Sequence, residues 1–191
     1  MVYAKDFDGN GSYDAVLGFY IEGKPYPMYH RDQLIDQMPM MRKKFYRYRL
    51  YAGTTMDKLF TPEQQKGMDT YSANCFESGV FINDGNNHYH FEAFPDEGQF
   101  SNISDFYTGD FDKDGHLDII AAGNSKDPEI GTGDYDAMAV MLLKGDGTGK
   151  FKADFMSGLN ERGEVRKMVA VGDRIILLKN NNSAVVYSLK K

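Results

Sequence analysis

Two aspartate-rich stretches with the same internal spacing constrain this chain more than any other feature of its sequence. The first is DFDGNGSYD at Asp6–Asp14, and the second is DFDKDGHLD at Asp110–Asp118. Each has oxygen-bearing side chains at positions 1, 3, 5 and 9 and a glycine at position 6. A calcium ion takes about six to eight oxygen ligands, and alternating carboxylates around a sharp glycine turn supply such a set. The spacing therefore predicts two Ca²⁺ sites.

In both stretches the main-chain carbonyl at position 7 is expected to complete the ligand set. The predicted ligands of the first site are Asp6, Asp8, Asn10, Ser12 and Asp14, and those of the second are Asp110, Asp112, Asp114, His116 and Asp118. The alternative is that these are ordinary turns, which also favour Asp, Asn and Gly. The repetition of the whole pattern favours the metal sites.

The residues after each stretch exclude the EF-hand, the most familiar calcium loop. An EF-hand needs a glutamate at position 12 and a helix on either side. Position 12 is Leu17 in the first stretch and Ala121 in the second. Each stretch leads into a short, apolar, partly β-branched run, which is typical of a strand. We therefore expect calcium loops that connect β-strands.

A repeated unit surrounds these loops. The segments 80–91 and 140–151 both run from valine to phenylalanine over the same length, and each reads as strand, glycine turn and strand. The unit is thus a meander of four antiparallel strands with a calcium loop after the first. A third, incomplete unit is expected near the C-terminus, with strands at 165–171, 174–178 and 184–189. A tight turn at Gly172-Asp173 replaces its loop, so no metal is expected there.

The first unit is longer than the second by about 44 residues, which are helical in character. We expect helices at 31–38, at 39–46 and around Met56 to Phe60, with a further helix start at Thr61. Residues from Gly23 to about Glu77 are therefore interpreted as a small helical insert. Without it, the repeat is about 60 residues long, which is typical of a propeller blade.

The two loops, the strands after them and the sequence GDGTGKF at 145–151 resemble FG-GAP/VCBS repeats, the calcium-binding blades of integrin-like β-propellers. The insert, with Tyr26-Pro27 and residues 31–34, and the segments 99–101 and 179–182 also resemble the C-terminal region of large secreted bacterial FG-GAP proteins. The resemblance implies an all-β fold: a partial β-propeller of about two and a half to three four-stranded antiparallel blades, with a small helical insert in the first.

The expected boundaries are 1–98 for blade 1, with its insert at about 24–77, 99–158 for blade 2 and 162–191 for a degenerate blade 3. A closed propeller needs at least four blades. We therefore expect the remaining blades, or another protein chain, as a partner.

The net charge, the predicted calcium sites and the single cysteine bear on the partners and the location of the protein. The net charge of −6 argues against nucleic acid as a partner, and two Ca²⁺ ions would bring it to −2. Millimolar Ca²⁺ is an extracellular condition, so a secreted, cell-surface or periplasmic location is expected, with any signal peptide upstream of Met1. No stretch has the length and apolarity of a membrane span. The lone Cys75 is expected to be a buried thiol.

The sequence RKKFYRYR at 42–49 interleaves cations with aromatic side chains. Such a pattern suits a glycan or a polyanion, with Arg42, Tyr46, Arg47, Tyr48 and Arg49 as candidate ligand-binding residues. The alternative is a helix whose cationic stems cover its own aromatics.

His88 and His90 share one strand face and could hold zinc, although a solvated face is favoured. No nucleophile, phosphate-loop or zinc-protease motif is present. The expected function is therefore non-catalytic: a calcium-stabilised propeller segment for binding or assembly. A glycan- or polyanion-binding module is the alternative, and an accessory part of a larger enzyme a third.

Overall fold

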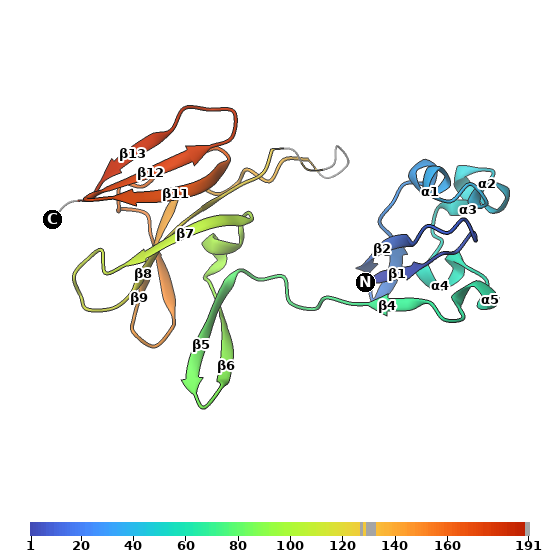
Figure 1. The fold of residues 1–191 in the computed structure, drawn as a ribbon, viewed down its shortest axis with the longest axis horizontal. Helices are drawn as coiled ribbons and strands as arrows, with labels where there is room; N and C mark the ends of the chain where they lie inside the picture. The colour runs from blue at the N-terminus through green and yellow to red at the C-terminus, as the bar shows by residue number, and fades with distance from the viewer. Residues whose placement is uncertain (127, 129–132, 190–191) are drawn as a thin grey trace. The chain divides into compact units, whose positions relative to one another are not determined.

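The computed structural model describes residues 1–126, 128 and 133–189 of the chain (Figure 1). Two compact units, Met1–Phe76 and Glu77–Lys191, make up the protein, and each is considered by itself. The first unit combines an antiparallel sheet with short helices, the second consists mainly of antiparallel sheets, and none of the sheets among the described residues closes on itself. The expectation of a mainly β fold with a helical segment near the N-terminus is confirmed. None of the described helices is both long and apolar enough to span a bilayer.

The first unit contains a four-stranded sheet in the order β3-β2-β1-β4. Its strands are β1 (Val2–Lys5), β2 (Asp14–Ile21), β3 (Lys24–Pro27) and β4 (Asp69–Tyr71). Strand β2 has a different partner along each half: its first half pairs with β1, and its second half pairs with β3. The strand alternates in its first half, with Val16 buried and the residues beside it exposed, as a half-buried strand should.

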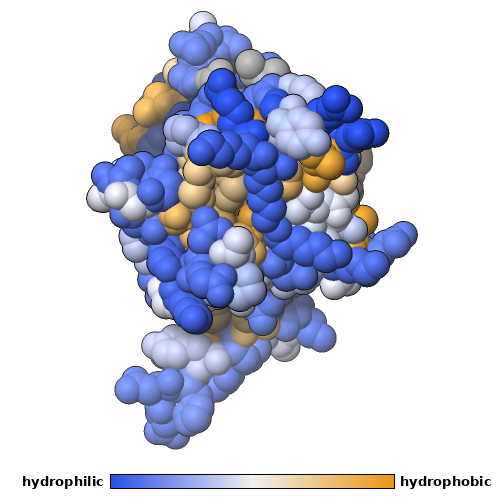
Figure 2. All heavy atoms as spheres, turned by 90° about the vertical axis from the view of Figure 1, so that its right-hand side faces the viewer, coloured by the Kyte–Doolittle hydropathy of each residue, from blue (hydrophilic) through white to orange (hydrophobic). Residues whose placement is uncertain are grey.

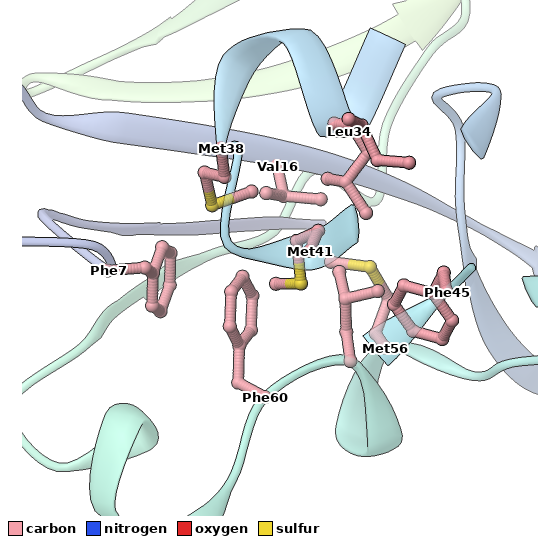
Figure 3. Packing of buried hydrophobic residues seen from close by; sticks show 10 residues of the cluster. Phe7, Val16, Leu34, Met38, Met41, Phe45, Met56 and Phe60 are labelled. Carbon is pink, nitrogen blue, oxygen red and sulfur yellow. The ribbon is translucent and has the colours of Figure 1, made fainter. Parts of the chain in front are cut away.

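Five short helices accompany this sheet, and three of them contribute buried residues to its core. They are α1 (Arg31–Gln37), α2 (Met41–Lys44), α3 (Tyr48–Tyr51), α4 (Met56–Leu59) and α5 (Pro62–Gln65). Figure 3 shows Val16 of the sheet packed among side chains from these helices, with methionines filling the space between them. The rings of Phe7 and Phe60 stack at 3.6 Å between centroids, which fixes the start of the first aspartate-rich loop against the helical layer.

The predicted helices at 31–38, at 39–46, around 56–60 and from Thr61 are present, although the second is only α2. Thr61 caps α5 as expected, because its hydroxyl accepts the Gln64 N–H while the Gln64 side chain accepts the Thr61 N–H. Helix α3 was not predicted as a separate element.

The composition of blade 1 differs from the prediction in two respects. The insert at 24–77 is not wholly helical, because β3 and β4 both lie within it and join the first sheet. The hairpin at 80–91 does not complete that sheet, since it forms a two-stranded sheet of its own. The edge of β2 that this hairpin would need is occupied: Met28 N–H donates to Leu17 O, and Gln37 Nε2 donates to Ala15 O. Blade 1 is therefore not the continuous four-stranded unit expected for 1–98.

Strand β3 is the edge of the first sheet on one side and contains two prolines. Met28 N–H points towards β2, and because successive N–H groups of a strand alternate in direction, the nitrogens of Pro25 and Pro27 face the opposite way. Proline occurs in sheets where its missing N–H is not needed, which is the outer side of an edge strand. This explains how a segment with two prolines can be a strand.

The described residues of the second unit form three sheets. Its elements are β5 (Gly79–Gly85), β6 (His88–Ala93), the 3₁₀ helix η1 (Asp96–Gln99), β7 (Ile103–Gly109), β8 (Asp118–Gly123), β9 (Met141–Gly145), β10 (Phe151–Asp154), β11 (Val165–Val171), β12 (Arg174–Lys179) and β13 (Val185–Ser188). Strands β7 to β10 form a meander in the order β10-β9-β8-β7, as predicted for 99–158. Strands β11 to β13 form a three-stranded sheet, as predicted for the incomplete unit.

Strand β8 lies at the centre of this unit and is buried on both faces. Ile120 and Ala122 belong to a core cluster shared with β11 and β12, whereas Ile119 and Ala121 belong to a second cluster with Phe94. The two faces of β8 thus hold the meander between the C-terminal sheet and the segment around β5 and η1.

A single carboxylate joins β7 to β11. Asp105 accepts from the Met168 N–H at 2.6 Å and from Lys167 Nζ at 3.1 Å. Burial raises the pKa of Asp105, but the Met168 N–H and the Lys167 ammonium outweigh it, so that this pKa lies below its ordinary value.

Two smaller expectations have different outcomes. The side chain of Cys75 is exposed, which corrects the expectation of a buried thiol: it lies in the segment after β4, outside the helices and strands. His88 and His90 are exposed on β6, as the favoured interpretation of a solvated strand face requires. His90 Nδ1 lies 2.8 Å from both carboxylate oxygens of Asp84.

Candidate metal centres

Each aspartate-rich stretch forms the connection between two antiparallel strands: the first joins β1 to β2, and the second joins β7 to β8 (Figure 1). The strand-to-strand setting is the one predicted from sequence. The loops can therefore be compared position by position.

In the first loop, the carboxylate at position 1 organises the backbone. Asp6 Oδ1 accepts from Gly9 N–H at 2.8 Å and from Asn10 N–H at 3.1 Å, and Asp6 Oδ2 accepts from Gly11 N–H at 2.9 Å. Asp8 Oδ1 accepts from Asn10 N–H at 3.2 Å, and Asn10 Oδ1 accepts from Ser12 N–H at 2.7 Å. The side chains at positions 1, 3 and 5 thus all turn inward.

The second loop repeats this arrangement at the corresponding positions. Asp110 accepts from Asp114 N–H at 3.1 Å and from Gly115 N–H at 3.0 Å. Asp112 Oδ1 accepts from Asp114 N–H at 3.2 Å, and Asp114 Oδ1 accepts from His116 N–H at 2.8 Å. Two stretches that are far apart in sequence therefore adopt the same local conformation.

The backbone of both loops is left-handed at positions 4 and 6. In the first loop these positions are Gly9 and Gly11, with φ of 74° and 86°; in the second they are Lys113 and Gly115, with φ of 65° and 89°. Glycine adopts such values without strain, whereas a residue with a Cβ does so at a cost of about 1–2 kcal/mol. The spacing predicted a glycine turn at position 6, whereas the left-handed backbone at position 4 was not predicted, since this position is a lysine, Lys113, in the second loop.

The aspartate at position 9 differs from the others because it is buried. Asp14 is 3% exposed and Asp118 is 0% exposed. Each accepts from the N–H at position 2, Phe7 at 3.1 Å and Phe111 at 2.9 Å. Asp118 Oδ1 also accepts from the Gly145 N–H at 3.0 Å, which links the loop to the end of β9. Position 9 thus fastens the loop to the sheet.

Carboxylate oxygens gather in both loops. One oxygen each from Asp6, Asp8 and Asp14 lie within 4.8 Å of one another in the first, and one each from Asp110, Asp112 and Asp114 do so in the second. Hard oxygen donors at this spacing suit Ca²⁺ better than softer metals. Both the type of the donor atoms and their closeness to one another therefore fit a calcium ion. Among the predicted ligands, Asp118 does not belong to the second group.

The pKa values of two carboxyl groups in the first loop shift in opposite directions. The N–H groups of Gly11, Gly9 and Asn10 stabilise the charged form of Asp6 and lower its pKa. Burial raises the pKa of Asp14, and the charges of Asp8 and Asp6 raise it further. A cation bound between these groups would relieve this repulsion.

A lysine outside the predicted ligand set lies beside the second loop. Lys144 Nζ is 3.3 Å from Asp112 Oδ2 and 3.1 Å from Asp154 Oδ2. Asp154 and then Asp112 raise the pKa of Lys144, and the Met156 N–H together with Lys144 lowers that of Asp154. The β8–β9 register pairs Ile119 with Leu143 and so places Lys144 opposite Asp118, at the end of the second loop. The contact between Lys144 and Asp112 follows from this register and could not be predicted without it.

The basic and aromatic residues of the insert are largely engaged with one another. The Arg31 guanidinium lies 4.7 Å from the centroid of the Tyr48 ring, and the Tyr48 hydroxyl donates to Asp32. Arg47 lies 5.7 Å from the centroid of the Tyr46 ring. Figure 2 looks onto the helical side of the first unit and shows hydrophilic side chains over most of it, with apolar atoms in patches between them.

Of the five candidate ligand-binding residues at 42–49, the structure brings Arg42 and Tyr46 to one shallow hollow, which Arg31 and Asp32 also line. Arg47, Tyr48 and Arg49 do not line it. The candidate set is therefore not assembled into one site.

Comparison with protein-family models, curated proteins and solved structures finds no match to this chain.

Proposed function

We propose that this protein is a non-catalytic, calcium-stabilised segment of a β-propeller that serves binding or assembly outside the cytoplasm. The observation that carries the proposal is the equivalence of the two loops. They share inward carboxylates at positions 1 and 3, left-handed backbone at positions 4 and 6, and a buried aspartate at position 9. Ordinary turns have no reason to share all three features.

The role proposed for the ion is structural. In the first loop, the buried Asp14 faces the charges of Asp6 and Asp8, and a divalent cation would neutralise that cluster at the bend between two strands. Ligands that bind only the folded state stabilise it, by about 2.7 kcal/mol when the free ligand is at about 100 times its dissociation constant.

The arrangement of the second unit supports the propeller part of the proposal. Strand β7 begins the four-stranded meander and β11 begins the three-stranded sheet, and the two first strands are joined through Asp105. The two sheets also share one core cluster. Adjacent blades of a propeller are related in this way, with their first strands side by side. The remaining blades would come from another part of a longer chain or from a partner.

Thermal unfolding in excess Ca²⁺ and in excess chelator tests the proposal. We expect a lower melting temperature in chelator, and a partial loss of the calcium-dependent increase in Asp8→Ala and in Asp112→Ala. The matched control is Asp57→Ala, which removes a carboxylate of α4 that belongs to neither loop. Identical melting curves with and without chelator would refute the proposal.

A further inference from the structure

A cleft in the second unit opens beside the second loop, and Asp110 and Asp112 of the loop's carboxylate cluster form part of its wall. It lies at the end of the core shared by the β7–β10 and β11–β13 sheets, and its volume is about 600 Å³. Small-molecule sites commonly measure about 300–1,000 Å³. Its walls come from β7, the first half of the second aspartate-rich loop, β8, β9, β10, the loop after β10 and the end of β13, which are all parts of the same unit.

The walls of the cleft are mainly apolar and include three half-buried aromatic rings. Tyr107 and Phe111 lie 6.0 Å apart between centroids, and Tyr187 contributes the third ring. Leu142 and Leu159 add aliphatic surface. Core clusters normally cover such rings, and here the ends of the two sheets leave them partly open. The cleft thus offers flat apolar surfaces to a ligand.

The charged groups of the cleft restrict the ligand further. Lys144 Nζ bridges Asp112 and Asp154, whose side chains are 29% and 22% exposed. An anionic ligand would meet these carboxylates, and a cationic ligand would meet the ammonium group. Both charges can be met by a neutral group that donates to a carboxylate and accepts from an ammonium group, such as a hydroxyl.

We propose that this cleft binds a neutral sugar. A pyranose ring combines the two required properties, because its C–H faces can pack on aromatic rings and its hydroxyls can bond to Asp154 and Lys144. Phe111 and Asp112 of the cleft belong to the aspartate-rich loop, whereas Asp154 and Lys144 lie outside it, so these two hydrogen-bonding groups are not ligands of the proposed calcium ion. When an ion holds Asp112, the Lys144–Asp154 pair still lines the cleft.

NMR titration of the full chain with methyl glycosides of glucose, galactose and mannose tests the proposal. We expect at least one glycoside to bind with a dissociation constant on the order of 1 mM. It should shift the ring resonances of Tyr107, Phe111 and Tyr187, both in Ca²⁺ and in chelator. Absence of binding by all three glycosides, or binding without these shifts, would overturn the proposal.

Two variants of the cleft are matched with controls elsewhere. Asp154→Asn keeps the shape of the side chain but removes a charged acceptor, and Lys144→Gln removes the ammonium donor; each should weaken binding about tenfold. Asp146→Asn, in the neighbouring β9–β10 turn, should bind as the parent protein does. Retained affinity in both cleft variants, or its loss in Arg47→Ala combined with Arg49→Ala, would place the sugar outside the cleft and overturn the proposal.

Discussion

Asp118 offers the sharpest test of how the second loop is fastened to its sheet. Its carboxylate is fully buried and accepts from two backbone N–H groups, those of Phe111 and Gly145. The Asp118→Ala change leaves both donors without this acceptor. A buried donor that loses its partner costs about 1–3 kcal/mol. We therefore expect the free energy of unfolding to fall by about 4 kcal/mol.

This loss should be present in chelator, because the two hydrogen bonds do not involve an ion. Asp112→Ala is the matched comparison: its carboxylate accepts one backbone N–H and pairs with Lys144 Nζ, which also pairs with Asp154, in an exposed part of the loop. We expect it to cost about 0.5–1 kcal/mol in chelator and more in Ca²⁺. Asp118→Asn keeps one acceptor oxygen and should fall between the two.

Urea unfolding monitored by far-UV circular dichroism measures these differences, and the absence of tryptophan rules out indole fluorescence as the probe. The comparison of variants uses transition midpoints at an unchanged slope. A loss below about 1 kcal/mol for Asp118→Ala in chelator would refute the reasoning from the two hydrogen bonds. Equal losses for Asp118→Ala and Asp118→Asn would show that the acceptor oxygens do not carry the effect.

Three further predictions concern other parts of the chain. The pKa of Asp105 is lowered in the folded protein, so the charged carboxylate stabilises the fold above the ordinary carboxyl pKa, and this stabilisation is lost as the pH falls through the lowered pKa. The urea midpoints of the parent protein and of Asp105→Asn should therefore differ at neutral pH and converge in acid. Gly123→Ala places a Cβ 1.8 Å from the backbone Asn102 O, so we expect a loss of at least about 2 kcal/mol by urea unfolding, whereas a loss under about 0.5 kcal/mol would contradict that geometry. Thr61→Ala removes the hydroxyl that caps α5 and should lower the free energy of unfolding by about 1 kcal/mol. The control is Thr55→Ala, because Thr55 is the N-cap residue of α4 but its side chain makes no capping hydrogen bond.

Local patterns in the sequence were sufficient for much of the site. The spacing of the aspartates identified both loops, and the apolar runs after them correctly indicated strands, because ligand spacing and strand alternation are properties of a few neighbouring residues. The same holds for α1 and for the Thr61 cap. The left-handed conformation at Lys113 was missed because a lysine gives no sign of positive φ.

Contacts between distant segments could not be predicted in the same way. Gly145 reaches Asp118, and Lys144 reaches Asp112, only through the register of β9 on β8. The place of the 80–91 hairpin was mispredicted because its length and turn match those of 140–151. Those features say nothing about whether the edge of β2 is free. In the structure, Met28 and Gln37 donate hydrogen bonds to that edge and so leave no room for the hairpin.

The two prolines of β3 have a consequence for behaviour at high concentration. An unprotected sheet margin can recruit a strand from a neighbouring molecule, and growth of this kind leads to aggregates. The carbonyl groups of an incoming strand on this side would find no backbone N–H donor at residues 25 and 27, because both are prolines. The two prolines therefore hinder self-association along this edge of the sheet. The same two residues would at first sight argue against a strand in this segment.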